Sequence, residues 1–214
     1  MGADPEDTGG HMGFSTDFVG HVDIEPPLND SEIAYLSAFG ASRRYDRGDP
    51  YDVPGNPRAE SGAGAGDRYN RPGQGQPNLW CDWEVCWDGC CISWSGKEKS
   101  YSMEPWLRYV IDHFLKPGAR AASDPRFEDF TFDHVLSGTV VGCRRDNKEL
   151  FAIRVEDNEV SREVMVRADP RYVDYPPLPY EDEIDREDDD RRRRRRRPLP
   201  EESSTVVPLP RRTV

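Results

Sequence analysis

The feature that most constrains the fold is residues 79–94, where tryptophan and cysteine crowd around an Asp88-Gly89 pair. Asp-Gly between alternating apolar residues is a strong signal for a β-hairpin with a two-residue type I′ turn. This turn predicts four pairs: Trp87 with Cys90, Cys86 with Cys91, Val85 with Ile92, and Trp83 with Trp94. One face then carries Leu79, Cys81, Trp83, Val85, Trp87, Cys90, Ile92 and Trp94, and the other carries Trp80, Asp82, Glu84, Cys86, Cys91 and Ser93. Because the first face is almost wholly apolar, we expect the hairpin at the heart of a domain.

A strand and a helix are predicted before the hairpin. Apolar and polar residues alternate over residues 14–24, which is typical of a strand. The helix that follows has a clear start signal, since Asn29 can act as N-cap and Glu32 can close a capping box. Gly40 is the expected C-terminal cap.

A helix and several strands are predicted after the hairpin. Apolar residues recur at helical spacing from Ser102, and the pattern stops at residues 116–118. Ser137-Gly138 is expected to be a turn between strands. The strands are residues 130–136, 139–144 and 150–155, with a further strand or helical turn at 160–166. The order β-α-β-β-α-β-β-β predicts one small α+β domain, with a mixed or antiparallel sheet and two helices on one face.

Composition divides the chain into a domain and its appendages. Residues 12–166 carry the periodic patterns, whereas residues 1–11 are expected to be a disordered or non-native extension. Residues 43–78 are rich in glycine and proline, which predicts a long flexible loop. Residues 167–214 are proline-rich and then strongly charged, which predicts a disordered tail.

The charge of the chain limits its partners. The formal net charge is −12, and most of it falls within the predicted domain. Nucleic-acid binding depends on basic residues that neutralise phosphates, so an acidic domain is a poor candidate for it. The sequence contains neither a signal-peptide pattern nor an apolar run long enough to cross a membrane. We therefore expect a cytoplasmic protein with reduced thiols and no membrane partner.

The cysteines suggest a redox site rather than a metal site. Cys86 and Cys91 face each other in the predicted hairpin, at a non-hydrogen-bonded pair whose spacing suits a labile disulfide. The same hairpin puts Cys81 and Cys90 on the opposite face, so the four thiols are not expected to share one metal ion. Buried, reduced thiols remain the simpler alternative.

Other side chains give weaker signals. Trp80, Asp82 and Glu84 fall on the outer face and are candidates for a surface contact. His134 and Cys143 could meet from neighbouring strands, although a structural role for the histidine is the simpler interpretation. No motif for catalysis or for cofactor binding is present, so we expect no catalytic residue, no cofactor and no metal.

The tail contains the chain's main basic feature. Seven consecutive arginines could contact nucleic acid or another anion, although acidic residues on both sides would weaken their field. They are Arg191, Arg192, Arg193, Arg194, Arg195, Arg196 and Arg197.

Three stretches of the sequence resemble a family of uncharacterised proteins from actinobacteria, other bacteria and phages. They are GQPNLWCDWEV, EKSYSMEPWLRYVIDHFLKPG and GTVVGC with ELFAIRVEDNEV, and residues 12–20 are similar to the family's MGxxTxFxG start. The resemblance implies a native start at Met12, a single domain, and a bacterial or mobile-element context. It supplies no activity, and Cys86, Cys90 and Cys91 do not resemble family features.

These observations favour a non-enzymatic protein-interaction module that binds an unknown protein partner. Two alternatives stay open. The first is a small redox or thiol enzyme that uses the Cys86/Cys91 face of the hairpin. The second is a nucleic-acid-associated protein that acts through its arginine tail.

Overall fold

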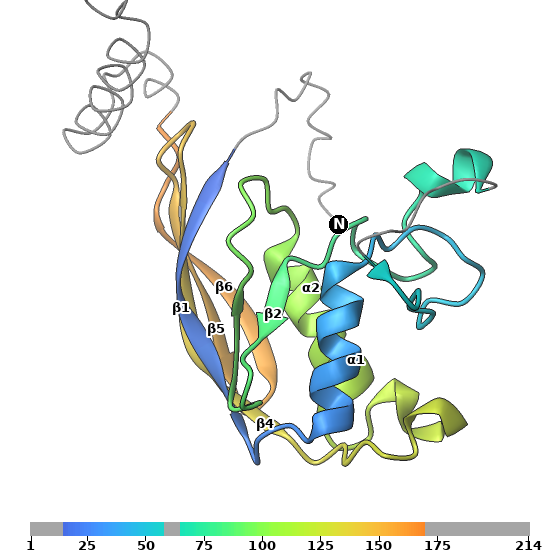
Figure 1. Cartoon of the computed structure of the whole chain (residues 1–214). Coiled ribbons are helices and arrows are strands. Elements are labelled where there is room, and N and C mark those ends of the chain that lie inside the picture. Colours follow the sequence, from blue (N-terminus) through green and yellow to red (C-terminus); the bar gives the residue numbers. More distant parts are fainter. Residues whose placement is uncertain (1–14, 58–64, 170–214) are drawn as a thin grey trace, which may run out of the picture. The chain divides into compact units, whose positions relative to one another are not determined.

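The protein folds as a six-stranded antiparallel sheet with both helices on one face. The computed structural model describes residues 15–57 and 65–169, all within one compact unit, Met1–Val173. The strand order is β2-β3-β1-β4-β5-β6 (Figure 1). The strands are β1 Thr16–Glu25, β2 Trp83–Val85, β3 Cys91–Trp94, β4 Val135–Arg144, β5 Leu150–Glu156 and β6 Glu159–Val166. The helices are α1 Asp30–Ala41 and α2 Met103–Val110, with short helical turns at Gly66–Asn70, Ile111–Leu115, Arg120–Ser123 and Pro125–Phe127. The predicted α+β class is confirmed.

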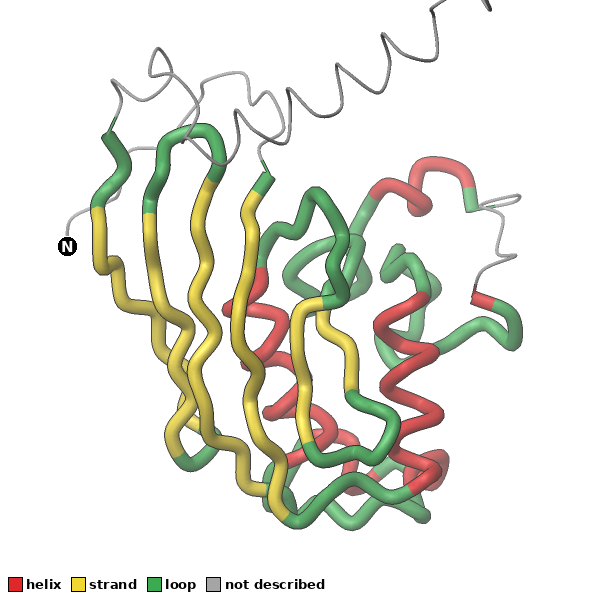
Figure 2. The backbone as a smooth tube through the Cα atoms, turned by 60° about the vertical axis from the view of Figure 1, so that its left-hand side comes forward, coloured by secondary structure: helices red, strands yellow, loops and turns green. Residues whose placement is uncertain are grey.

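The core lies between the sheet and the two helices (Figure 2). β1 contributes Val22 and Ile24 at alternate positions, because successive strand residues point to opposite faces. The other fully enclosed core side chains come from every layer and include Phe39, Ile92, Trp106, Leu107, Phe114, Leu136, Val140 and Ile153. Within the described residues, no helix is long and apolar enough to span a membrane.

The predicted turn at Ser137-Gly138 is wrong, because β4 runs through it without a break. Gly138 lies opposite Val22 on β1. Its φ is 158°, and a Cβ there would approach the backbone oxygen of His21 to 2.7 Å. Gly138 therefore allows two long strands to approach closely, as glycine in a strand interior often does. The expected strand over residues 130–134 is also wrong, since these residues form a loop that leads into β4.

A type I′ turn joins β5 and β6. Asp157 and Asn158 have φ of 48° and 71°, and they connect the paired residues Glu156 and Glu159. Two successive positive φ values define a type I′ turn, which Asp and Asn tolerate. The strand alternative for residues 160–166 is confirmed.

The start of α1 is held by several side-chain hydrogen bonds. Asn29 and Glu32 form the predicted capping box. The Glu32 carboxylate also accepts hydrogen bonds from the backbone N–H of Thr131 at 2.8 Å and from its hydroxyl at 3.1 Å. His134 Nε2 lies 3.1 Å from the same carboxylate, and the side chains of both residues are fully buried. The pair therefore ties α1 to the loop before β4.

The geometry of His134 indicates a charged imidazole. Its Nδ1 lies 2.6 Å from the backbone oxygen of Pro26, and its Nε2 faces the Glu32 carboxylate. Both partners accept, so both ring nitrogens donate. Burial opposes the charge, but these hydrogen bonds outweigh it and raise the pKa of His134 above its ordinary 6.5. Burial likewise opposes charge on Glu32, yet the bonds from His134, Thr131 and Asn29 lower its pKa below 4.5.

The end of α1 differs from the prediction. The helix continues through Gly40 to Ala41, and Ser42 is the C-cap. A Cβ on Gly40 would lie 2.7 Å from the backbone oxygen of Trp83. Gly40 thus allows α1 and β2 to approach closely, and it does not terminate the helix.

Parts of the glycine-rich loop pack tightly onto the domain. Arg44 is 1% exposed, and its guanidinium donates to the backbone oxygens of Pro50 at 2.6 Å and Asp52 at 2.9 Å. The guanidinium also lies 4.0 Å from the centre of the Phe39 ring. Arg44 therefore anchors the first half of the loop. The flexibility predicted for residues 43–78 stays a prediction.

Candidate functional site at the hairpin tip

The β2–β3 hairpin lies at one edge of the sheet rather than at its centre. β3 pairs with β1, and β2 is the edge strand. The predicted register is confirmed for Val85 with Ile92 and for Trp83 with Trp94. Beyond Val85 the structure departs from the prediction, and this departure creates the candidate site. We call residues 86–91 the hairpin tip.

The hairpin tip contains a four-residue loop, residues 87–90, in place of the predicted two-residue turn. Gly89 N–H donates to the oxygen of Cys86 at 3.1 Å, which closes a β-turn with Trp87 and Asp88 at its centre. Within the hairpin tip, only Gly89 has a positive φ, at 72°. Cys86 N–H donates to the oxygen of Cys91 at 3.0 Å. The predicted non-hydrogen-bonded pairing of these two cysteines is therefore wrong.

Contacts with a distant part of the chain explain this loop. Ile24 N–H donates to the oxygen of Cys90 at 2.8 Å, and Leu28 N–H donates to the oxygen of Gly89 at 3.1 Å. A Cβ on Gly89 would lie 2.6 Å from the oxygen of Leu28. The end of β1 and the segment that follows it thus supply hydrogen-bond donors to two carbonyl groups of the loop. They also fix the hairpin tip in place.

Trp87 projects from the hairpin tip into solvent. Its exposed fraction is 89%, whereas the alternation predicted a core position. The prediction is wrong because strand alternation ends at Val85, and Trp87 sits at the corner of a turn. A tryptophan this exposed on a hydrogen-bonded loop is uncommon, since large aromatic side chains are usually well buried.

Three cysteine side chains converge beside Trp87. The Sγ atoms of Cys86, Cys90 and Cys91 all lie within 4.8 Å of one another, and those of Cys86 and Cys90 are 3.7 Å apart. The Cys91 N–H donates to the Cys86 sulfur at 2.9 Å. Cys90 was predicted on the face of the hairpin opposite Cys86 and Cys91. This prediction is wrong, because the four-residue loop turns Cys90 toward Cys86. Cys81 is separate and buried.

Cys90 and Cys91 of the hairpin tip are hard to ionise, because their pKa values are raised. A hydrogen bond with Asp88 raises the pKa of Cys90 to about 11, with a further contribution from Cys86. Burial and the neighbouring Cys86 raise the pKa of Cys91 to about 12. Hydrogen bonds from Cys86 and Cys90 lower the pKa of Asp88. Because the thiolate is the reactive species, these values weigh against thiol catalysis, and the redox interpretation of Cys86 and Cys91 stays a prediction.

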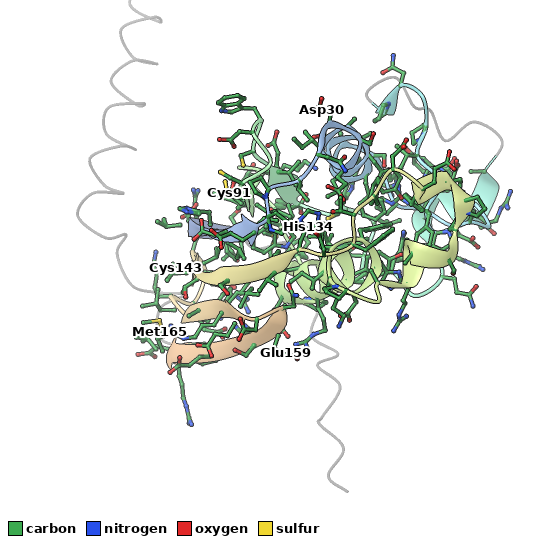
Figure 3. The ribbon with its side chains drawn as sticks, turned by 90° about the horizontal axis from the view of Figure 1, so that it is seen from below. Asp30, Cys91, His134, Cys143, Glu159 and Met165 are labelled. Carbon is green, nitrogen blue, oxygen red and sulfur yellow. The ribbon has the colours of Figure 1, made fainter. Side chains whose placement is uncertain are left out.

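The surroundings of the hairpin tip are acidic. Asp23 on β1 is directly opposite Cys91, and Glu84 on β2 lies two residues before Cys86. Both carboxylates are exposed, as is Asp88. Cys91 lies toward the edge of the domain, apart from His134 (Figure 3). The exposed outer face near the hairpin tip therefore carries negative charge.

Of the three residues predicted to form a surface contact, Trp80 and Glu84 are exposed and Asp82 is buried. Trp80 is 38% exposed beside Lys97, and it lines a pocket of ≈ 290 Å³ together with Glu84. Asp82 is 2% exposed and pairs with Lys97 at 3.1 Å, so its predicted surface position is wrong. Asp82 lies before the first residue of β2, so the alternation of strand side chains, which predicted an outer-face position for Asp82, does not apply to it.

The remaining candidates do not form a second site. His134 and Cys143 lie at opposite ends of β4 and cannot act together (Figure 3). Residues 191–197 are outside the described residues, so their contact with nucleic acid stays a prediction.

Comparison of the chain with protein-family models, with curated proteins and with solved structures gave no match. The resemblance to the bacterial and phage family is thus neither supported nor opposed.

Proposed function

We propose that this protein is a binding module that inserts the indole of Trp87 into an apolar pocket of a partner protein. The observation that carries the proposal is the 89% exposure of Trp87 on a loop with defined hydrogen bonds. Tryptophan is, with tyrosine and arginine, enriched among the side chains that dominate binding energy at interfaces.

The rigidity of the hairpin tip supports this function. One hydrogen bond from Ile24 on β1, one from Leu28 before α1 and one across the turn fix the backbone on both sides of Trp87. A side chain presented by an ordered backbone loses little further entropy on binding. The hairpin tip therefore has the form of a preorganised anchor.

The charge around Trp87 indicates the partner's chemistry. Asp88 is exposed next to Trp87 in the chain, Asp23 is exposed opposite Cys91, Glu84 is exposed on β2, and the whole chain carries a net charge of −12. An apolar pocket with lysine or arginine at its rim would complement this surface. The same charge disfavours nucleic acid as the partner of the domain.

Site-specific photo-crosslinking tests the proposal. A photoreactive phenylalanine analogue is placed at position 87 in the full chain, and at position 19 as a control. Val19 is 76% exposed on β1, so it is matched in exposure and apolar character. We expect a defined protein adduct from position 87 in cells of the source organism and none from position 19. Equal adducts from the two positions, or an adduct from position 19 alone, would contradict the proposal.

A further inference from the structure

Three thiols on one short loop suggest a second property of the hairpin tip, which does not depend on Trp87. Cys86 directly follows β2, Cys91 begins β3, and Cys90 lies between them on the loop. Within the described residues this is the group of side chains whose ligand atoms come close enough together to share a metal ion. The four-residue loop creates it, because a two-residue turn would point Cys90 to the other face.

The sulfur positions fit a thiolate metal site. Metal–sulfur bonds of about 2.3 Å place the sulfurs of a tetrahedral or trigonal site about 3.8–4.0 Å apart. The sulfurs of Cys86 and Cys90 are 3.7 Å apart, and Cys91 lies within 4.8 Å of both. The Cys91 N–H that donates to the Cys86 sulfur adds a hydrogen bond of the kind that surrounds ligand sulfurs.

We infer that Cys86, Cys90 and Cys91 bind one thiophilic d¹⁰ metal ion, Zn²⁺ or Cu⁺, through three sulfurs. Thiolates select these ions over harder cations such as Mg²⁺ and Ca²⁺. On binding, each S–H bond breaks, its proton passes to solvent, and a sulfur–metal bond replaces it, with no change of oxidation state. The exposed carboxylates of Asp23 and Asp88 add a field that favours a cation.

The role expected of Asp88 differs between the two ions. Zn²⁺ prefers four ligands, and a carboxylate can be the fourth. The Asp88 carboxylate is hydrogen-bonded by the thiols of Cys86 and Cys90, so it is a candidate oxygen ligand beside these two sulfurs, although it lies outside the group whose ligand atoms are all within 4.8 Å of one another. If the ion is Cu⁺, the three sulfurs suffice and Asp88 is not needed.

The experiment titrates the full reduced chain with Zn²⁺ and, separately, with Cu⁺ under anaerobic conditions, against a chromophoric chelator. We expect one ion per chain, a thiolate-to-metal charge-transfer band, and protection of Cys90 from alkylation in peptide mapping. Loss of a second-sphere partner typically weakens a metal site by 10–100-fold, so loss of a ligand in Cys90→Ser should weaken binding by more than about 100-fold. Cys90 is exposed, so the variant is expected to fold, and its unfolding midpoint checks this.

Cys143→Ser is the matched control, since Cys143 lies on β4 away from the hairpin tip. It should bind as the wild type does. If Asp88→Asn binds Zn²⁺ more weakly than the wild type and binds Cu⁺ with unchanged affinity, the ion is zinc. If Asp88→Asn binds both ions as the wild type does, and Cu⁺ binds more tightly than Zn²⁺, the ion is copper. Wild-type affinity in Cys90→Ser, or no binding of either ion by the wild type, would overturn the inference. Trp87→Ala removes no sulfur and should still bind metal, so this result is independent of the partner proposal.

Discussion

Replacing Glu32 with alanine is expected to lower the free energy of unfolding by about 3–5 kcal/mol, the range seen when one partner of a buried ion pair is removed. The variant leaves the His134 imidazole buried without its counter-charge. It also removes the acceptor for the Asn29 and Thr131 N–H groups. Urea unfolding measures the effect. Asp30→Ala is the control: Asp30 lies in the same helical turn but is exposed, so its loss should be under about 1 kcal/mol.

The pH dependence of this effect identifies the ion pair as its cause. The depressed pKa of Glu32 stabilises the fold above pH 4.5, and that contribution disappears as the pH falls through the lower, folded-state pKa. The raised pKa of His134 stabilises the fold below pH 6.5, and that contribution disappears as the pH rises through the higher, folded-state pKa. The difference between wild type and Glu32→Ala should therefore be largest between pH 4.5 and 6.5. A difference independent of pH would contradict the assignment of charge to this pair.

Replacing Arg44 with alanine is expected to cost about 3 kcal/mol, because it combines a buried cavity with carbonyl groups that lose their donors. The oxygens of Pro50 and Asp52 would both lose the guanidinium. Arg44→Lys should recover only part of the loss, since an ammonium cannot reproduce the planar donor pattern. Thermal and urea unfolding measure the stability.

Hydrogen exchange locates the Arg44 effect. The amides of Tyr51 and Asp52 should exchange faster in Arg44→Ala, because their segment is no longer anchored. Arg71→Ala is the control, since Arg71 is an exposed arginine of the same loop and should change stability by less than about 0.5 kcal/mol. If Arg44→Ala and Arg71→Ala behaved alike, the anchoring role of Arg44 would be wrong.

Sequence reasoning predicted the parts of the fold that depend on neighbouring residues. The capping box of Asn29 and Glu32 spans three residues, and the register of Val85 with Ile92 follows from alternation within one hairpin. The apolar residues of α2 likewise follow a pattern formed by residues close together in the sequence. Such patterns can be read from the chain because their partners lie within a turn or a hairpin of one another.

The candidate site could not be predicted in this way, because a distant segment decides its shape. Asp88-Gly89 suits a two-residue turn, but the N–H groups of Ile24 and Leu28 bind the carbonyls of the hairpin tip and stabilise a longer loop. Gly89 also suits that longer loop, since it can take a positive φ after a type I turn. The exposure of Trp87 and the convergence of the cysteines both follow from this one difference.

The buried pair of Glu32 and His134 was missed for the same reason. Its members are far apart in the chain, and a polar residue in a predicted strand gives no sign of its partner. Only the three-dimensional structure brings the start of α1 to the loop before β4.

The measurement that tests the central claim most directly is the affinity of Trp87→Ala for the purified protein identified by crosslinking at position 87. Calorimetry with the wild type, with Trp87→Ala and with Trp80→Ala compares the hairpin tip with the other exposed tryptophan of the hairpin region. We predict that Trp87→Ala loses at least about 2 kcal/mol of binding free energy, roughly 30-fold in Kd, with no change in the midpoint of unfolding. Trp80→Ala should bind almost as tightly as the wild type. Wild-type affinity in Trp87→Ala would contradict the claim that the hairpin tip is the binding site.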